Sequence, residues 1–427
     1  MISSISYLSI NISEIWMQLR REPLHFWFFC GYLFVEYVRP QSIYPGLAVI
    51  PWAKLFVVGA AIGCFQAKEA VSSSSSLTKY YWGLTLVVFL SSSFAEFPGL
   101  AFDQISVVIN WLIIYHLFVR IVTTKFRFFI VVLLIMLASY KMSQHAAFSF
   151  ARRGFTFERW GISGTPGFFG NAADLGVQML IILPLSVIFY KRCHYYWGVL
   201  KKAFFIFIPI TVLAAIIATG QRNTLVGLAA ICLVVSLAAK RRIRNLFLMS
   251  IFGICLIAVM PQALVDRFDT SGKDNTSLSR LKYWTRGMQF FGEHPILGIG
   301  HNNWAAYYLK YHPGESLRSD TQEVAHSTPV TVLAELGILG FICYYGLALT
   351  TISLNLQTMK ISSSNLEPLW RDIAFALNIG LVGFLAASLF LSVTFYPFLF
   401  IQASLSAALY NLLIREKHND LEASRAI

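Results

Sequence analysis

The chain has 427 residues, of which 56% are hydrophobic, 15% are aromatic and only 13% are charged. Soluble domains carry about 25% charged residues, so this composition excludes an ordinary soluble protein and indicates an integral membrane protein. The formal net charge of +13 does not indicate nucleic-acid binding, because the basic residues interrupt apolar runs and do not gather on one soluble domain.

Twelve apolar stretches approach the length of about 20 residues that a helix needs to cross a bilayer. In chain order they cover residues 24–38, 46–66, 80–98, 101–119, 126–143, 172–190, 203–219, 223–239, 245–261, 328–354, 370–392 and 394–413. The pair 80–98 and 101–119 also fits a re-entrant hairpin. We therefore expect an all-α, polytopic membrane protein with about twelve transmembrane helices.

Lysine and arginine are concentrated in alternate connections between these stretches. With the N-terminus in the cytoplasm, basic runs such as residues 240–244 fall inside, which satisfies the positive-inside rule. Both termini are then cytoplasmic, and two long polar segments, 144–171 and 262–327, lie outside. The chain accordingly divides into nine spans in residues 1–261, an outer loop in residues 262–327, and three spans with a cytoplasmic tail in residues 328–427.

The outer loop 262–327 is long enough to be functional in its own right. Two stripes of apolar and aromatic residues recur in it at spacings of three and four, and each stripe predicts an amphipathic helix. The first stripe comprises Leu278, Leu281, Trp284, Met288 and Phe291, and the second comprises Trp304, Tyr308 and Tyr311. We expect both helices to be anchors in the membrane interface.

One histidine directly precedes the tenth stretch, in the sequence EVAHSTPVTVLAELGILG. His326 is followed by Thr328, which can cap a helix, and by Pro329, which suits a first helical turn. The partial positive charge of a helix N-terminus disfavours an imidazolium, so we expect His326 to be neutral near pH 7. A neutral imidazole can act as a general base. The alternative is a hydrogen bond from His326 to a neighbouring loop.

Two arginines of the outer face run against the positive-inside trend. Arg222 opens the eighth stretch after a very short connection, and Arg280 lies on the first amphipathic helix. Together with His326 they would form an anion site beside a base. Snorkelling of Arg222 and a solvated charged face around Arg280 are the alternatives. A phosphate-binding site next to a bilayer suggests a lipid-linked substrate.

The outer segment ARRGFTFERWGISGTPGFFGN adds Arg152, Arg153 and Arg159 as candidate substrate contacts beside a glycine-rich loop. Motifs of metal or nucleotide chemistry, such as DxD, HExxH and a Walker loop, are absent from the sequence, as is the GxSxG nucleophile elbow. The six cysteines include no CxxC pair. We therefore expect group transfer without a metal or cofactor, in which arginines neutralise a leaving diphosphate.

The sequence HSTPVTVLAELGILG resembles the histidine-then-glycine motif of the O-antigen ligase family, at His326, Ser327 and Gly337. The preceding SRLKYWTRGMQFFGEHPILGIGHNNW is similar to the Arg-x-x-x-Trp and Pro-x-x-Gly-x-Gly segment of that family. The sequence GTPGFFGNAADLG resembles its upstream glycine-rich loop. The resemblance spans roughly residues 160–345.

This resemblance implies a GT-C-like glycosyltransferase of the bacterial inner membrane, active in lipopolysaccharide biosynthesis. It would transfer a polysaccharide from undecaprenyl diphosphate to lipid A-core at the periplasmic face. His326 would be the base on the acceptor hydroxyl, and Arg222 and Arg280 would hold the diphosphate. Further candidate substrate contacts are Trp284, Arg286 and His301.

Three alternatives stay open at this point. O-antigen polymerases and protein O-glycosylating ligases use the same donor and differ in the acceptor. A transporter or flippase is less favoured, because transport predicts ionisable residues near mid-membrane, whereas those of this chain lie mostly near the ends of the predicted spans.

Overall fold

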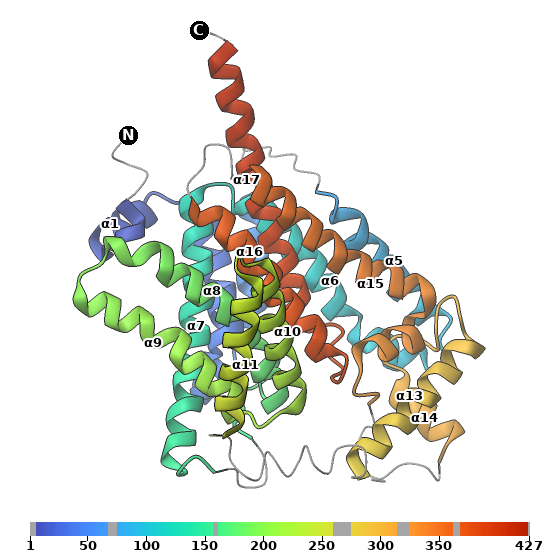
Figure 1. The fold of residues 1–427 in the computed structure, drawn as a ribbon. Helices are drawn as coiled ribbons and strands as arrows, with labels where there is room; N and C mark the ends of the chain where they lie inside the picture. Colours follow the sequence, from blue (N-terminus) through green and yellow to red (C-terminus); the bar gives the residue numbers. More distant parts are fainter. Residues whose placement is uncertain are drawn as a thin grey trace.

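The computed structural model describes residues 6–66, 75–156, 161–258, 275–313, 324–361 and 368–425. These residues form helices and no strands (Figure 1), which confirms the all-α expectation. The helices are η1 Ser6–Ser9, α1 Ile12–Leu19, α2 Leu24–Val38, α3 Pro40–Ile43, η2 Pro45–Leu47, α4 Trp52–Gln66, α5 Thr78–Ser93, α6 Pro98–Ile121, α7 Lys125–Arg152, α8 Ala172–Cys193, η3 His194–Tyr196, α9 Val199–Ala218, α10 Arg222–Ala238, α11 Arg242–Ala258, α13 Asn275–Glu293, α14 Trp304–Tyr311, α15 Thr328–Ile361, α16 Pro368–Ser388 and α17 Pro397–Arg425.

Each of the twelve apolar stretches falls on a helix of its own. Among the described residues, seven helical segments are long and apolar enough to cross a membrane: Pro98–Ile121, Lys125–Arg152, Ala172–Tyr196, Val199–Ala218, Thr328–Ile361, Pro368–Ser388 and Pro397–Asn419. Trp52–Gln66 and Arg222–Ala238 are shorter apolar helices. A multi-pass membrane protein is therefore confirmed, and the count of twelve spans stays a prediction.

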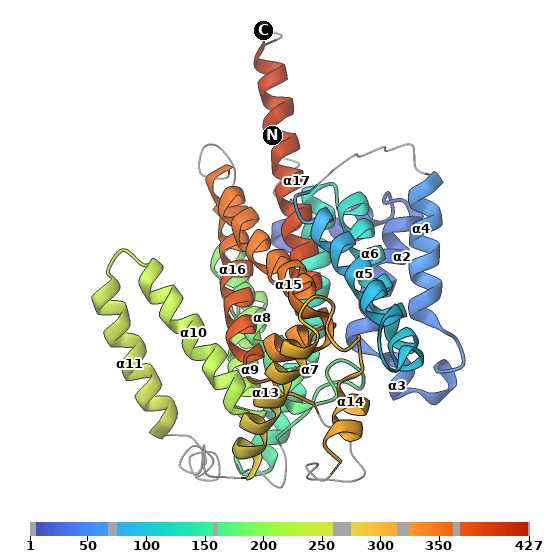
Figure 2. The ribbon, with the colours of Figure 1, turned by 90° about the vertical axis from the view of Figure 1, so that its right-hand side faces the viewer.

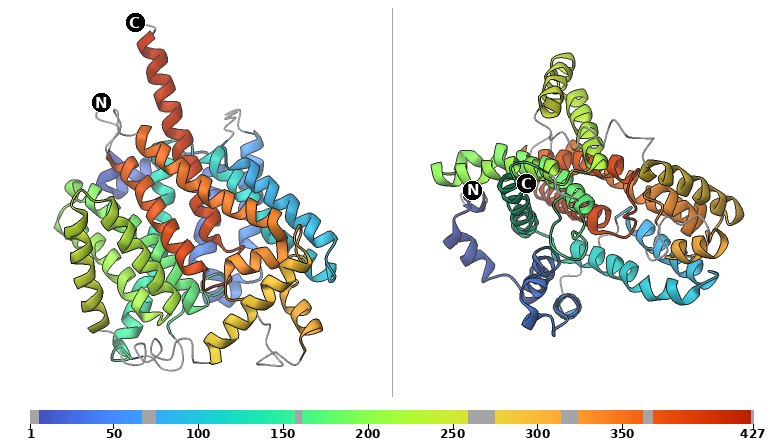
Figure 3. Two further views of the ribbon diagram at one scale, coloured as in Figure 1. Left: turned by 45° about the vertical axis from the view of Figure 1, so that its right-hand side comes forward. Right: turned by 90° about the horizontal axis from the view of Figure 1, so that it is seen from below.

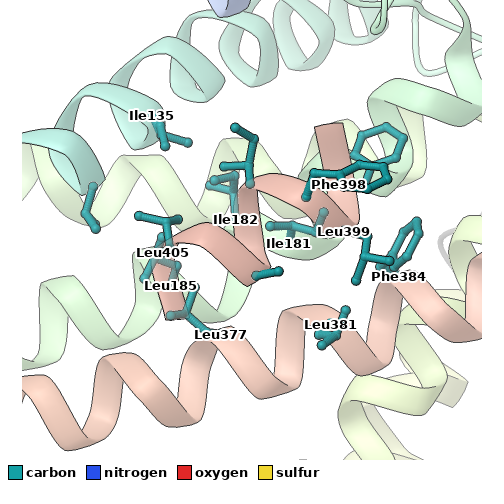
Figure 4. Close-up of a cluster of buried hydrophobic side chains, with 14 of the residues drawn as sticks. Ile135, Ile181, Ile182, Leu185, Leu377, Leu381, Phe384, Phe398, Leu399 and Leu405 are labelled. Atoms are coloured by element: carbon teal, nitrogen blue, oxygen red, sulfur yellow. The ribbon is translucent and has the colours of Figure 1, made fainter. Parts of the chain in front are cut away.

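The centre of the bundle is a cluster of aliphatic and aromatic side chains from α7, α8, α16 and α17 (Figure 4). Small residues bring the backbones together where these helices cross. A Cβ added at Gly380 of α16 would lie 3.0 Å from the carbonyl oxygen of Ile181 in α8. Small residues matter in a bilayer because lipid tails are as apolar as leucine, so that association of helices depends on close packing.

The two ends of the bundle differ in what they carry. The helices nearest to the two termini, α1 and the last turns of α17, lie at one end, whereas α13 and α14 lie at the opposite end (Figures 1 and 3). We call this opposite end the loop end. The helices α10 and α11 stand to one side of the bundle (Figure 2). The predicted outer segment 144–171 begins as helix, because α7 continues to Arg152.

The loop end has a small hydrophobic core of its own. Trp304 and Tyr308 of α14 are buried there against Tyr283 and Phe290 of α13. For Trp304 and Tyr308 the expectation of a surface anchor is therefore wrong: the aromatic stripe faces a neighbouring helix. On α13 the apolar residues Leu278, Leu281 and Met288 are about half exposed, which agrees with an interfacial face.

Candidate active site

His326 lies in a short, tightly held loop just before α15. Its side chain is half-buried, and its φ of +50° is in the left-handed region, which few residues other than glycine adopt. The helix begins with Ser327 as its cap, because the amide of Thr331 donates to the Ser327 carbonyl oxygen at 2.9 Å. The hydroxyl of Thr328 is therefore used elsewhere and does not cap the helix as expected.

The connection between α16 and α17 holds this loop in place. The Thr328 hydroxyl donates to the carbonyl oxygen of Leu391 at 2.6 Å and accepts from the amide of Val393 at 3.1 Å. The amide of Ser327 donates to Oγ of Ser392 at 3.2 Å. We call residues 391–393 the clamp. The clamp was not among the predicted site residues, because it has no charged residue and Ser392 is its one hydroxyl side chain.

The helix α13 meets the His326 loop from the other side. The indole of Trp284 donates to the carbonyl oxygen of Ala325 at 3.0 Å, and a Cβ added at Gly287 would overlap Val330 of α15. Arg280 precedes Trp284 by four residues and Gly287 by seven, so all three lie on one face of α13. The face of α13 that carries Arg280 is therefore the face that contacts the His326 loop.

Arg222 approaches the clamp along the antiparallel pair of α10 and α16. A Cβ added at Gly227 would lie 2.7 Å from the carbonyl oxygen of Gly383 and 3.3 Å from Cβ of Ala387. From this crossing, the start of α10 at Arg222 and the chain that follows Ala387 run in the same direction. Arg222 lies five residues before Gly227, and the clamp begins four residues after Ala387, so both lie beyond this crossing in the same direction.

The helix α15 is broken at Gly337, a glycine of the sequence motif. At Gly337 the backbone leaves the helical conformation, with φ of +62° and ψ of −163°. Residues 295–300 pair with the interrupted backbone: the amide of Ile338 donates to Pro295 at 2.8 Å, and the amide of Ile299 donates to Ala334 at 2.9 Å. A Cβ added at Gly337 would overlap the carbonyl oxygen of Ile296. Glycine is therefore required at position 337 for the backbone of α15 to lie against the backbone of residues 295–300.

The carboxyl group of Glu335, which is buried at this break, accepts from the amide of Trp304 at 3.1 Å. It thereby binds a free amide at the start of α14. Glu335 was not among the predicted residues, because a single acidic residue in an apolar run does not reveal its partner.

Of the further candidate contacts, Trp284 supports the His326 loop, and Arg286 contacts a residue of its own helix. The guanidinium of Arg286 donates to Gln289 at 2.9 Å, two residues round the helix from Trp284. His301 is 5% exposed and packs edge-on against Phe395 at 4.9 Å. Burial lowers the pKa of His301 to about 4, so this imidazole is neutral at pH 7.

The basic residues of the upstream loop do not gather at His326 in the described part of the chain. Arg152 and Arg153 are exposed at the end of α7, which Figure 1 shows at the opposite side of the loop end from α13. Arg159 lies outside the described residues. Arg39 is a further basic residue beside the glycine-rich loop: its guanidinium lies against Gly167 and is 3.2 Å from Glu36. Its signal was the same as for Arg222, a basic residue in a predicted outer connection.

Among the described residues, no group of three or more His, Cys, Asp or Glu side chains is arranged to hold a metal ion.

Residues 205–345 match the model of the family described as O-antigen ligase. The match runs from α9 into α15 and includes Arg222, Arg280, His326 and Gly337, and it confirms the resemblance drawn from the motifs. No curated protein sequence matches the chain.

Proposed function

From the match of residues 205–345 to the O-antigen ligase family, we propose that the chain is an O-antigen ligase. It transfers a glycan from undecaprenyl diphosphate to lipid A-core, without a metal and with inversion at the anomeric carbon. The family supports an O-antigen ligase or polymerase type of function and lipid-linked glycan substrates in general. The specific donor, the acceptor and the mechanism are our proposal.

One observation carries the assignment of the site. The His326 loop is bonded on one side to α13 through Trp284 and on the other side to the clamp. This arrangement supports Arg280 and Arg222 as neighbours of His326 on two separate elements. A base between two cations suits an acceptor hydroxyl and a diphosphate.

In the proposed step, the acceptor hydroxyl attacks the anomeric carbon of the donor while its proton passes to His326. The bond between the anomeric carbon and the diphosphate oxygen breaks, and undecaprenyl diphosphate leaves with the electron pair. Arg222 and Arg280 stabilise the charge of this leaving group through forked hydrogen bonds.

We further propose that the loop end is periplasmic and that both termini are cytoplasmic, in the inner membrane. The position of α1 and the end of α17 at one end of the bundle, opposite α13 and α14, supports this orientation. In this arrangement residues 1–261 and 328–427 form the membrane bundle, and residues 262–327 form a periplasmic loop.

The test is a transfer assay with purified full-length chain, undecaprenyl diphosphate-linked glycan and lipid A-core, with and without a chelator. We expect transfer under both conditions. His326→Asn should reduce the rate by about 10² to 10⁴, the usual contribution of a general base. Asparagine tolerates the left-handed backbone of residue 326, so the variant should reach wild-type membrane abundance. Wild-type transfer by His326→Asn would remove the base assignment.

The acceptor is checked in a strain that lacks the gene. Loss of a ligase leaves lipopolysaccharide with bare core, whereas loss of a polymerase leaves core with a single repeat unit. An unchanged lipopolysaccharide pattern together with loss of a glycosylated protein would instead indicate a protein O-glycosylating ligase.

A further inference from the structure

Asp174, at the first turn of α8, is a buried carboxyl group to which the proposed chemistry gives no role. It is 4% exposed, and within the described part of the chain it makes no hydrogen bond or ion pair. Removing a carboxyl group from water without a partner is costly. The N-terminus of α8 offsets part of that cost, but the cap of this helix is the side chain of Asn171.

The loop that precedes Asp174 carries an aromatic residue that contacts Tyr396. The preceding loop is closed by a hydrogen bond from Gly164 to the carbonyl oxygen of Phe169 at 2.8 Å. Phe168 of this loop contacts Tyr396 edge-on at 5.2 Å. Burial and the negative charge of Asp174 raise the pKa of Tyr396 to about 12, so the phenol keeps its proton and can donate a hydrogen bond at neutral pH.

Tyr396 is in direct chain continuity with the clamp. Val393 bonds to Thr328, two residues after His326, and Tyr396 follows Val393 by three residues. Three residues span at most about 10 Å when extended. Tyr396 therefore lies within about 10 Å of Val393 in the clamp, and its contact with Phe168 brings the glycine-rich loop that precedes Asp174 to the same region.

Charge separates this location from the diphosphate site. A carboxyl group offers a phosphate no cationic donor, whereas its oxygens accept hydrogen bonds from hydroxyl groups. A lone carboxylate does not make a calcium or magnesium site, since such sites need six or more oxygen ligands. The ligand that suits a buried carboxyl group, a phenol donor and a neighbouring aromatic ring is a neutral sugar that bears hydroxyl groups.

We propose that Asp174 and Tyr396 form a saccharide-binding subsite, in which Asp174 accepts a hydrogen bond from a sugar hydroxyl and Tyr396 donates one. The subsite rests on the proposed function for its substrates. It binds a sugar of either the acceptor or the donor glycan, while the arginines hold the diphosphate.

The test measures KM and kcat of the purified full-length chain for lipid A-core and for the undecaprenyl diphosphate-linked glycan separately. Asp174→Asn should raise KM for one of the two by about 10- to 100-fold, the usual effect of losing a hydrogen bond to a charged group. Tyr396→Phe should raise the same KM by about 2- to 10-fold. Asp103→Asn is the matched control, because Asp103 is exposed on α6, and its KM values should equal those of the wild type.

The substrate whose KM rises identifies the sugar that is bound. Unchanged KM values in both variants, with a lower melting temperature, would make Asp174 a structural residue and overturn the subsite. If the wild type transfers nothing, the proposed function fails, and fluorescence titration of each substrate into the wild type and Asp174→Asn tests the subsite alone. Binding that is about tenfold weaker in the variant supports it, and equal binding or none overturns it.

Discussion

Arg280 is placed by the face of α13 on which it lies. It shares that face with Trp284, which bonds to the residue before His326, whereas Lys282 is exposed and about 200° further round the helix. We predict that Arg280→Lys loses most of its activity, because an ammonium group cannot reproduce the planar, forked hydrogen bonding of a guanidinium. Transfer rate against donor concentration, at equal membrane abundance, is the measurement.

Lys282→Ala is the control for this prediction and should keep its activity. If Arg280 belonged to a solvated charged face, its lysine variant would be silent, since exposed charge pairs contribute only about 0–1 kcal/mol. Full activity of Arg280→Lys would remove Arg280 from the site.

His301 should make the stability of the protein depend on pH. Its pKa is about 4 in the folded protein against an ordinary value of 6.5, so the unfolded chain binds more protons between these values. The free energy of unfolding therefore falls as the pH drops from about 6.5 to about 4, by up to about 3 kcal/mol from this residue. Melting temperatures against pH for His301→Gln should fall less steeply than those of the wild type.

The control is His418→Gln, because His418 is on the exposed tail of α17 with 70% of its side chain accessible. Its curve should follow that of the wild type. Parallel curves for His301→Gln and the wild type would show that His301 is protonated as readily in the folded protein as in the unfolded chain.

At the scale of the element, the break in α15 depends on Gly337. Its backbone conformation is one that only glycine adopts readily, at a cost of about 1–3 kcal/mol for other residues, and an added Cβ would also overlap Ile296. Gly337→Ala should therefore lower the melting temperature in detergent. Gly99→Ala on α6, where no atom lies within 4 Å of the added Cβ, should leave it unchanged or raise it slightly.

The helices themselves could be predicted because a bilayer leaves few alternatives. Backbone groups in hydrocarbon must bond within their own segment, so a run of apolar residues reports a helix directly. The break at Gly337 could not be predicted in this way, because a glycine in an apolar run is compatible with an unbroken helix. The prediction that Trp304 and Tyr308 are surface anchors was wrong for a related reason: an aromatic stripe has the same pattern whether it faces lipid or a neighbouring helix.

Part of the candidate site was also visible in the sequence, and part was not. His326, Arg222 and Arg280 were identified because charge and polarity are unusual in predicted outer connections. The clamp was missed because its bonds join Ser327 and Thr328 to residues more than sixty positions later, and long-range pairing of hydroxyl and backbone groups leaves no local pattern. Tyr396 was missed for the same reason.

At the scale of the whole molecule, the proposed orientation can be tested with single cysteines in a background without the native thiols. Ser163 is exposed in the glycine-rich loop and Glu422 is exposed near the end of α17. We predict that an impermeant maleimide labels Ser163→Cys in intact cells, whereas it labels Glu422→Cys only after the cells are permeabilised. The reverse pattern would place the loop end in the cytoplasm and contradict a periplasmic active site.

The pairing of residues 295–300 with the break in α15 has a consequence for chimeric proteins. The hydrogen bonds between the two segments are made by backbone groups, for example from Ile338 to Pro295. The conformation of each segment therefore depends on that of the other. A graft that exchanges residues 262–327 alone between two homologues would separate residues 295–300 from the α15 break of their own protein. An exchange that continues through residue 339 keeps them together, and this is where we would place the junction when specificity is moved from one protein to another.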